Sequence, residues 1–296
     1  MSLESVGLLI ERARQGRYAL GYFESWNLES LQGVIDAAEQ TRSPIVIGFN
    51  GEFLSRDDRL AGERLNWYAA LGRAAAESAT VPCGLIFNEC SSDDWVVQAI
   101  ESGFNLVMPA DPEAPFDTYV HRVSHLTRLA HSRGVAVEAE VGELPAGLAG
   151  HGDVDGSLTD ASLAARFVEA TGVDLLAVSV GNVHVKLEGS RDLDLNRLDE
   201  IHRRVEIPLV LHGGTGISAD SLRRAIGLGV VKVNYGTYLK QRYLRAIRSM
   251  LERECPDPHR VLGMGGPDDL LVAGRLAVRD AVRERIDLLG CRGRAD

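Results

Sequence analysis

Residues 205–218 read VEIPLVLHGGTGIS, an apolar run that ends in a histidine and then turns at once through two glycines. A short apolar run bounded by turn residues is typical of a buried strand in a parallel sheet. His212, which closes this strand, can aim a ring nitrogen into a pocket, and Gly213 and Gly214 let backbone amides approach an anion closely. The alternative is an ordinary strand-to-helix turn in which Ser218 caps the helix.

Seven further apolar runs of strand length accompany this one, and amphipathic segments such as 28–41 and 117–134 separate them at helical spacing. Near-continuous runs of Val, Ile, Leu and Ala are typical of parallel strands that are covered on both faces. The predicted strands are residues 17–23, 44–49, 81–87, 104–109, 134–140, 173–181, 207–212 and 229–235. This pattern predicts an α/β fold, a (β/α)8 TIM barrel formed as a single domain over residues 1–296, with an open doubly wound sheet as the alternative.

The composition excludes several classes of function. The formal net charge of −10 gives a field that repels nucleic acid and anionic lipid, so neither is expected as a partner. No apolar run approaches the length of a membrane-spanning helix, and the first residues do not have the layout of a signal peptide. The 4 cysteines form no CxxC pair and are too few for a disulfide framework, which fits a reducing compartment. A cytoplasmic enzyme is therefore expected.

Two stretches interrupt the alternation of strands and helices. Residues 145–160 are too rich in Gly and Asp for a helix, and they have the length and composition of a mobile active-site loop that offers His151, Asp153 and Asp155. Residues 255–269 form an irregular break before a last amphipathic helix.

Reactive groups of a TIM barrel project from the carboxyl ends of its strands. The side chains expected there are Glu24, Asn88, Glu89, Glu138, Glu140, His184, His212, Lys232 and Asn234. Such a group would be costly to desolvate without a ligand, a metal or mutual pairing. His184 ends the strand before His212, and histidines of neighbouring strands can share a divalent cation, although either one alone is as easily a hydrogen-bonded core residue.

The last predicted strand also ends in a distinctive turn. Residues 231–237, VKVNYGT, place Asn234 at the strand end and Gly236 and Thr237 at the start of a helix. Together with the HGGTG turn, to which Thr215 adds a hydroxyl group, they predict a phosphate cradle between the last two strands.

These blocks resemble the class II, metal-dependent aldolases of fructose-bisphosphate and tagatose-bisphosphate type. VAVEAEVGEL, TGVDLLAVSVGNVH, IPLVLHGGTGI and LGVVKVNYGT are similar to the four main blocks of that family in the same order, and the similarity spans nearly the whole chain. The resemblance implies a lyase of carbohydrate metabolism, an aldolase that uses zinc or another divalent metal. It also implies a phosphorylated sugar or ketone as substrate and a homo-oligomer.

The resemblance assigns roles to individual residues. It implies that His184 and His212 bind the metal, with Glu140 beside it as a supporting residue or alternative ligand. The substrate and phosphate positions that it implies are Gly181, Val185, Gly213, Gly214, Thr215, Asn234, Tyr235, Gly236 and Thr237.

The third strand departs from the family pattern, because IFNECSS (86–92) stands where the family typically reads HLDHGSS. Asn88 replaces the proton-transferring aspartate, and an amide cannot exchange a proton at a useful pKa. Glu24, which stands in the place of a family asparagine, or Glu140 is therefore expected to move the proton. Glu89 replaces the third metal histidine and can complete the set, since two histidines and a glutamate form an established zinc site.

Two other functions stay open. Asn88 and Glu89 are also compatible with a non-catalytic relative that binds a phosphorylated metabolite or supports a partner subunit; Glu89 would then pair with Lys232 or an arginine. A metal-free aldolase could use Lys232 as a Schiff-base lysine. The alternative for this lysine is an ion pair with Glu138 or Glu140 in the barrel core.

Overall fold

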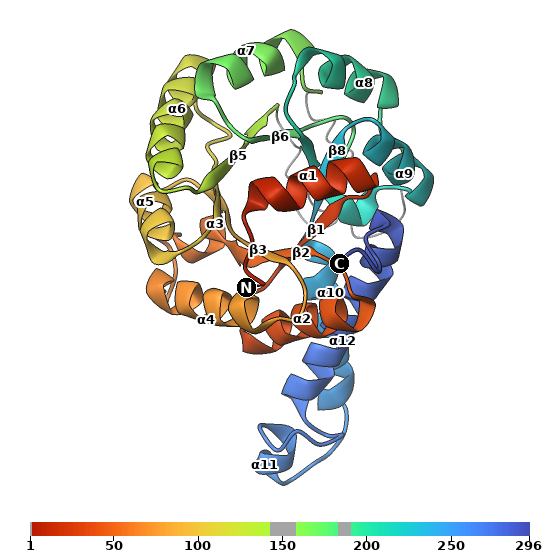
Figure 1. Cartoon of the computed structure of the whole chain (residues 1–296). Coiled ribbons are helices and arrows are strands. Elements are labelled where there is room, and N and C mark those ends of the chain that lie inside the picture. Colours follow the sequence, from red (N-terminus) through yellow and green to blue (C-terminus); the bar gives the residue numbers. More distant parts are fainter. Residues whose placement is uncertain (1, 143–157, 183–190) are drawn as a thin grey trace.

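Eight parallel strands close into a barrel in chain order, and the last strand pairs with the first (Figure 1). A computed structural model describes residues 2–142, 158–182 and 191–296. The strands are β1 (Leu20–Glu24), β2 (Ile45–Asn50), β3 (Cys83–Cys90), β4 (Leu106–Pro109), β5 (Ala136–Val141), β6 (Leu175–Val178), β7 (Leu209–Leu211) and β8 (Val230–Tyr235). Each predicted run overlaps one strand, so the TIM barrel is confirmed, and the pairing of β1 with β8 excludes the open sheet. The boundaries of the domain at 1 and 296 stay a prediction.

The helices surround the barrel, except that the first lies across one of its ends and the short helix at 258–261 lies away from it (Figure 1). They are α1 (Val6–Gly16), α2 (Leu28–Thr41), α3 (Gly51–Leu54), α4 (Leu65–Ser78), α5 (Asp93–Ser102), α6 (Phe116–Ser132), α7 (Ala161–Thr171), α8 (Leu195–Arg204), α9 (Ala219–Gly227), α10 (Thr237–Leu251), α11 (Pro258–Val261) and α12 (Leu270–Leu289). Local sequence sets several of their starts. Asn27 and Ser30, for example, cap α2 reciprocally, since the backbone N–H of each donates to the side chain of the other. The helices predicted at 28–41 and 117–134 are α2 and α6.

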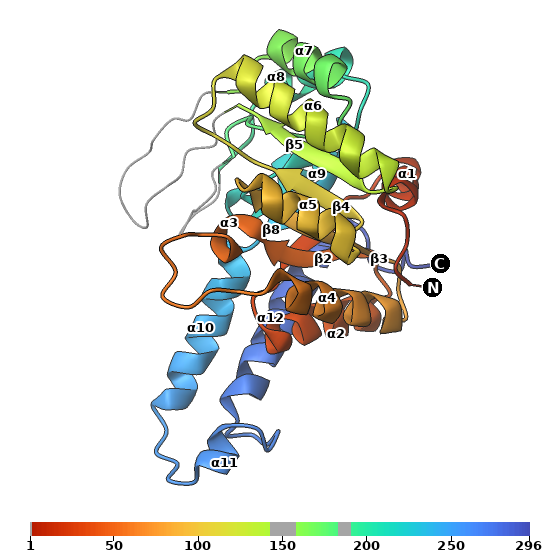
Figure 2. The ribbon, with the colours of Figure 1, turned by 90° about the vertical axis from the view of Figure 1, so that its left-hand side faces the viewer.

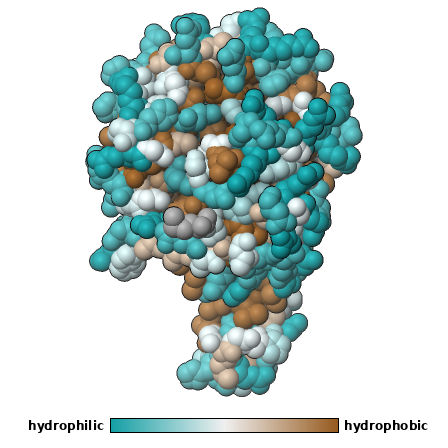
Figure 3. Space-filling view, viewed as in Figure 1, coloured by the Kyte–Doolittle hydropathy of each residue, from teal (hydrophilic) through white to brown (hydrophobic). Residues whose placement is uncertain are grey.

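The helices α10 and α12 project from the barrel as a pair with α11 at its tip (Figure 2). The stretch predicted as an irregular break, 255–269, therefore contains one helical turn at the end of a hairpin. Leu251, Leu262 and Met264 are exposed on this hairpin, and apolar surface interrupts its polar surface in Figure 3. None of the helices in the described ranges is long and apolar enough to cross a membrane.

Strand alternation directs a polar set of side chains into the barrel. Lys232 and Asn234 on β8 point inward, where the lysine meets Glu138 of β5. Phe23 and Tyr235 point to the outer face, where their rings stack at a centroid distance of 5.6 Å. The carboxyl end of the barrel is consequently lined by charged groups, whereas the layer between strands and helices is apolar.

We expect the Gly48→Ala variant to lose about 3 kcal/mol of unfolding free energy. Gly48 pairs with Ile86 between β2 and β3, and a Cβ at Gly48 would lie 1.9 Å from the carbonyl oxygen of Ile86. The strands would have to separate to admit it. Denaturant unfolding measures the loss. The control is Gly227→Ala in α9, where a Cβ meets nothing within 4 Å and alanine favours the helix; equal stability of the two variants would contradict the prediction.

Candidate active site

His212 directly follows β7 and is completely buried at the carboxyl end of the barrel. Its Nε2 lies 3.1 Å from Oε1 of Glu138. Its Nδ1 lies 3.1 Å from Oε1 of Glu89 and 3.4 Å from Oε2 of Glu140. Burial alone would lower the pKa of the imidazole, but Glu140, Glu138 and Glu89 outweigh burial and raise this pKa well above its ordinary value. The three carboxylates thus favour the protonated form of His212.

Lys232 lies deeper in the barrel and shares the carboxylate of Glu138 with His212. Its Nζ is 2.8 Å from Oε2 of Glu138 and donates to Oδ1 of Asn234 at 2.6 Å. Burial lowers the pKa of Lys232. Burial would also raise the pKa of Glu138, but Lys232 and His212 outweigh it and hold this pKa below its usual value. The predicted ion pair of Lys232 in the barrel core is confirmed, with Glu138 as its partner.

Glu89 reaches His212 because the backbone of β3 is irregular. In a regular strand Glu89 would face away from its inward neighbour Asn88. The backbone at Glu89 is left-handed, with a φ of 52°, and the pairing of β3 with β4 shifts register between Phe87 and Cys90. Asn50 then holds the carboxylate by donating from Nδ2 to Oε2 of Glu89 at 2.8 Å. A left-handed glutamate is costly, so the contacts of its side chain offset local strain.

The other two predicted catalytic positions line the same mouth. Asn88 is buried and accepts a hydrogen bond of 3.5 Å from Nδ2 of Asn234. The carboxylate of Glu24, at the end of β1, forms an ion pair with Lys240 of α10. It also lies against Gly236, where a Cβ would be 2.2 Å from Oε2 of Glu24. Glu24 therefore borders the glycine turn that follows β8.

The two glycine turns lie next to each other, as the cradle prediction requires. Gly213 is left-handed, with a φ of 63°, and begins a 3-10 turn over Gly214–Gly216. A Cβ on Gly214 would lie 2.6 Å from the ring of Tyr235, so this turn packs directly on β8. Thr215 belongs to this turn, and Thr237 opens α10 directly after Gly236. The α10 helix therefore begins directly after the strand on which the first turn packs, and a helix N-terminus is a favourable place for an anion.

Two details refine the predicted cradle. Ser218 does cap α9, by accepting from the backbone N–H of Ser221, so the helix-cap role considered for this turn is confirmed, whereas its anion-binding role stays a prediction. The ring of Tyr235 lies on the outer face of β8, opposite Lys232 and Asn234, so Tyr235 can face the mouth only through its backbone.

Several predicted positions lie outside the described residues: His151, Asp153, Asp155, His184 and Val185. Gly181, just before them, is left-handed with a φ of 94°. Asn182 follows it and donates from Nδ2 to the carbonyl oxygens of Val178 and His212, at 3.2 and 3.1 Å. This amide ties the end of β6 to the end of β7 two residues before His184.

Sequence reasoning did not single out Asn182, Asn50 or Lys240, although each contacts a residue that it did predict. Asn50 is the last residue of β2, and Asn182 directly follows the strand predicted at 173–181, so an asparagine at a strand end is the signal that could have found them. Lys240 lies on a helix, one turn beyond the glycine of the last βα turn, and its partner Glu24 is 216 positions away. No local pattern predicts that pair.

Comparisons with known proteins agree with this fold. The family model described as fructose-bisphosphate aldolase class-II matches residues 4–294. A fructose-bisphosphate aldolase of Geobacillus stearothermophilus is 33% identical over 270 residues, which are 90% of this chain and 92% of that protein. The crystal structure of the YdjI aldolase from Escherichia coli K12 has a TM-score of 0.82 at 30% identity and covers 99% of this chain and 100% of its own.

A putative fructose-1,6-biphosphate aldolase from Coccidioides immitis has a TM-score of 0.80 at 26% identity, with coverage of 98% of this chain and 97% of its own. These matches extend over almost the complete barrel, including the strand ends that carry the site. The chain therefore belongs to the class II fructose-bisphosphate aldolase family.

Proposed function

We propose that this chain is a divergent aldolase-type lyase that cleaves or forms a C–C bond in a ketose phosphate or a related phosphorylated carbonyl compound, with the help of a divalent metal. Membership of the class II family and the aldolase relatives support a lyase. The observation that carries the proposal is the position of His212 and its carboxylates beside the two adjoining glycine turns. The proposed reactive centre and the proposed anion site thus share one mouth.

The residues fit a divalent cation, although no group of three His, Cys, Asp or Glu side chains in the described part of the chain is arranged to hold a metal by itself. Nδ1 of His212 lies within 3.4 Å of both Glu89 and Glu140. Oε1 of Glu140 is buried without a hydrogen-bond partner among the described residues. With a neutral imidazole, the three carboxylates and the one ammonium of Lys232 leave a charge of −2, which a divalent cation would neutralise. We propose His212, Glu89 and His184 as ligands, with Glu140 beside them.

A bound zinc or other divalent ion would polarise the carbonyl group of the substrate. Residues of the chain bind the phosphate and move the proton. The backbone amides of the Gly213–Gly216 turn and of the start of α10 hold the phosphate. Asn88 can donate a hydrogen bond to a substrate oxygen but cannot take a proton, so a carboxylate must move it. We propose Glu140, which lies beside His212, or Glu24, which lies beside Gly236, for this step.

Proton exchange tests the proposal directly. The purified protein, supplied with Zn²⁺, Co²⁺ or Mn²⁺, is expected to exchange a carbon-bound proton of dihydroxyacetone phosphate with solvent and to cleave at least one ketose phosphate. Absence of both reactions with every metal would contradict it. Borohydride trapping of a ketose phosphate on Lys232 without metal would point to Schiff-base chemistry instead, which the ion pair of Lys232 with Glu138 disfavours.

A second candidate, a non-catalytic binder of phosphorylated metabolites, is favoured by the amide at Asn88. The two candidates differ in a simple measurement. Binding of dihydroxyacetone phosphate without proton exchange, in protein that retains no metal after reconstitution, would support the binder. A homo-oligomer and a cytoplasmic location stay predictions.

Metal binding at about pH 7.5 is expected to release about one proton per ion. The carboxylates around His212 raise its pKa and favour the protonated imidazole, whereas a metal ligand must be neutral. Calorimetric titration of the metal-free protein in two buffers with different heats of ionisation measures the release. Equal heats in both buffers would show that the metal does not displace a proton from His212.

A further inference from the structure

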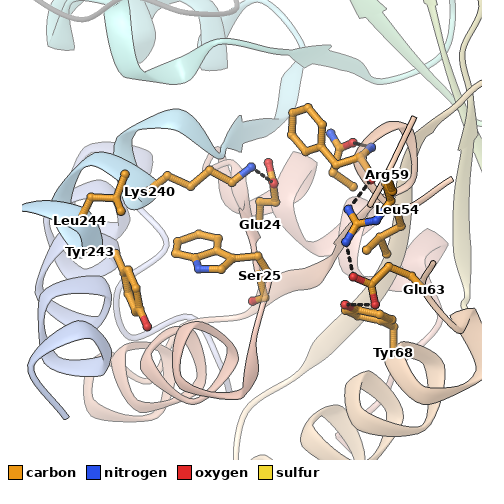
Figure 4. Close-up of a pocket in the computed structure, with 12 residues that line it drawn as sticks. Glu24, Ser25, Leu54, Arg59, Glu63, Tyr68, Lys240, Tyr243 and Leu244 are labelled. Carbon is orange, nitrogen blue, oxygen red and sulfur yellow. Dashed lines mark hydrogen bonds and ion pairs between the residues drawn. The ribbon is translucent and has the colours of Figure 1, made fainter. Parts of the chain in front are cut away.

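A cavity of about 410 Å³ opens beside the candidate active site, between the end of β1, the segment that joins α3 to α4, and α10. Figure 4 shows its charged and aromatic lining. Its volume lies in the range of small-molecule sites. Two residues belong to both places: Glu24 lines the cavity and contacts Gly236 of the phosphate cradle, and Asn50 lines the cavity and binds Glu89. A substrate that is anchored in the cradle could therefore extend past His212 into this cavity.

The ammonium group of Lys240 is already paired within the cavity. It forms an ion pair with Glu24, and the two side chains point toward each other in Figure 4. Its Nζ also lies 4.2 Å from the ring centroid of Phe53 and 5.8 Å from that of Trp26. Aromatic faces and a carboxylate together satisfy this cation.

The guanidinium group of Arg59 is engaged in the same way on the opposite wall. Its Nε donates to the carbonyl oxygen of Ala61 at 3.1 Å and its Nη1 to that of Phe53 at 2.8 Å. Its Nη2 pairs with Glu63, which also accepts a hydrogen bond of 2.9 Å from the hydroxyl of Tyr68. All three nitrogens of Arg59 therefore have partners, and the cavity contains as many carboxylates as cations.

A doubly charged phosphate that approaches either cation meets the carboxylate already paired with it, so Glu24 and Glu63 would repel the phosphate. An uncharged polyhydroxylated chain meets no such cost. Its hydroxyl groups can donate to the paired carboxylates, and its C–H faces can pack on aromatic rings such as Trp26, which meets Tyr243 edge to face at 5.4 Å.

We propose that this cavity binds the distal end of the substrate, beyond the bond that is cleaved, and that this end is an uncharged polyhydroxylated chain. The substrate class is then a ketose 1-phosphate without a second phosphate group. This inference rests on the proposed function, which places the phosphorylated end of the substrate in the cradle. It adds where the other end of the substrate binds and what chemistry that end has.

Non-cleavable alditols test the inference without catalysis. In calorimetric titrations of the metal-loaded protein, a hexitol 1-phosphate is expected to bind about tenfold more tightly than the corresponding hexitol 1,6-bisphosphate. Equal affinity, tighter binding of the bisphosphate, or no binding of either alditol would overturn the inference.

A matched pair of variants tests the role of the engaged cations. Glu63→Gln releases Arg59 and is expected to shift the preference toward the bisphosphate by about tenfold. Glu77→Gln removes the same kind of i,i+4 partner from Arg73, outside the cavity, and should leave both affinities unchanged. If both variants behave like the wild type, Arg59 does not select the substrate and the inference fails.

Cleavage assays separate this inference from the proposed function. If a hexitol 1-phosphate binds preferentially but no ketose 1-phosphate is cleaved, the proposed function fails and the cavity keeps its specificity. If ketose phosphates are cleaved but the bisphosphate is bound and cleaved preferentially, the function stands and the inference is overturned.

Discussion

Replacing Lys232 by methionine is expected to lower the free energy of unfolding by about 3–5 kcal/mol. Methionine fills a similar volume but removes the ammonium group that lies 2.8 Å from Glu138 inside the barrel. Glu138 is completely buried, so its charge would keep only His212 as a cationic partner among its described contacts. Denaturant unfolding at neutral pH measures the loss.

Lys240→Met is the matched control for this variant. It also removes the lysine of a Lys–Glu pair, but the side chain of Lys240 is 32% exposed, and ion pairs that water reaches contribute about 1 kcal/mol or less. The double variant Lys232→Met/Glu138→Gln should recover part of the loss, because no buried charge is left uncompensated. Equal stabilities of the two lysine variants would show that burial does not determine the effect.

Replacing Glu89 by glutamine is expected to weaken metal binding and to slow proton exchange of dihydroxyacetone phosphate, each by at least about 100-fold. Glutamine keeps the size of the side chain and can still accept from Asn50, but it removes the negative charge beside Nδ1 of His212. Metal content after dialysis and the exchange rate at saturating metal measure the two effects.

The control for this variant is Glu101→Gln, which removes a carboxylate from the exposed face of α5. It should match the wild type in both measurements. A Glu89→Gln protein that keeps stoichiometric metal and the wild-type exchange rate would show that the carboxylate at this position is not a ligand.

The barrel could be predicted from the sequence because each of its strands is a self-contained signal. Runs such as 44–49 and 229–235 are apolar on both faces and are bounded by turn residues, and this pattern identifies them without knowledge of their neighbours. The projection of α10 and α12 could not be predicted. Their amphipathic pattern indicates helices but does not say that the two helices pair with each other beyond the barrel.

The candidate site was predictable only in part. The position of His212, Lys232 and Asn234 at strand ends follows from chain order, because all parallel strands present the same end. The proximity of Glu89 to His212 follows only from the family resemblance and not from the strand pattern, since it depends on a backbone irregularity in β3 that no residue type indicates. The cavity beside Glu24 was also beyond prediction, because its walls come from segments far apart in the chain.

The left-handed backbone at Glu89 also limits which side chains can occupy this position. Apart from glycine, the residues that adopt this region most readily are asparagine, aspartate and histidine, whereas valine, isoleucine and threonine clash with their own backbone. Substitutions that this backbone conformation tolerates therefore tend to keep a polar side chain beside His212. A side chain that presents a nitrogen atom and one that presents an oxygen atom can therefore replace each other at position 89 without a change in the backbone of β3.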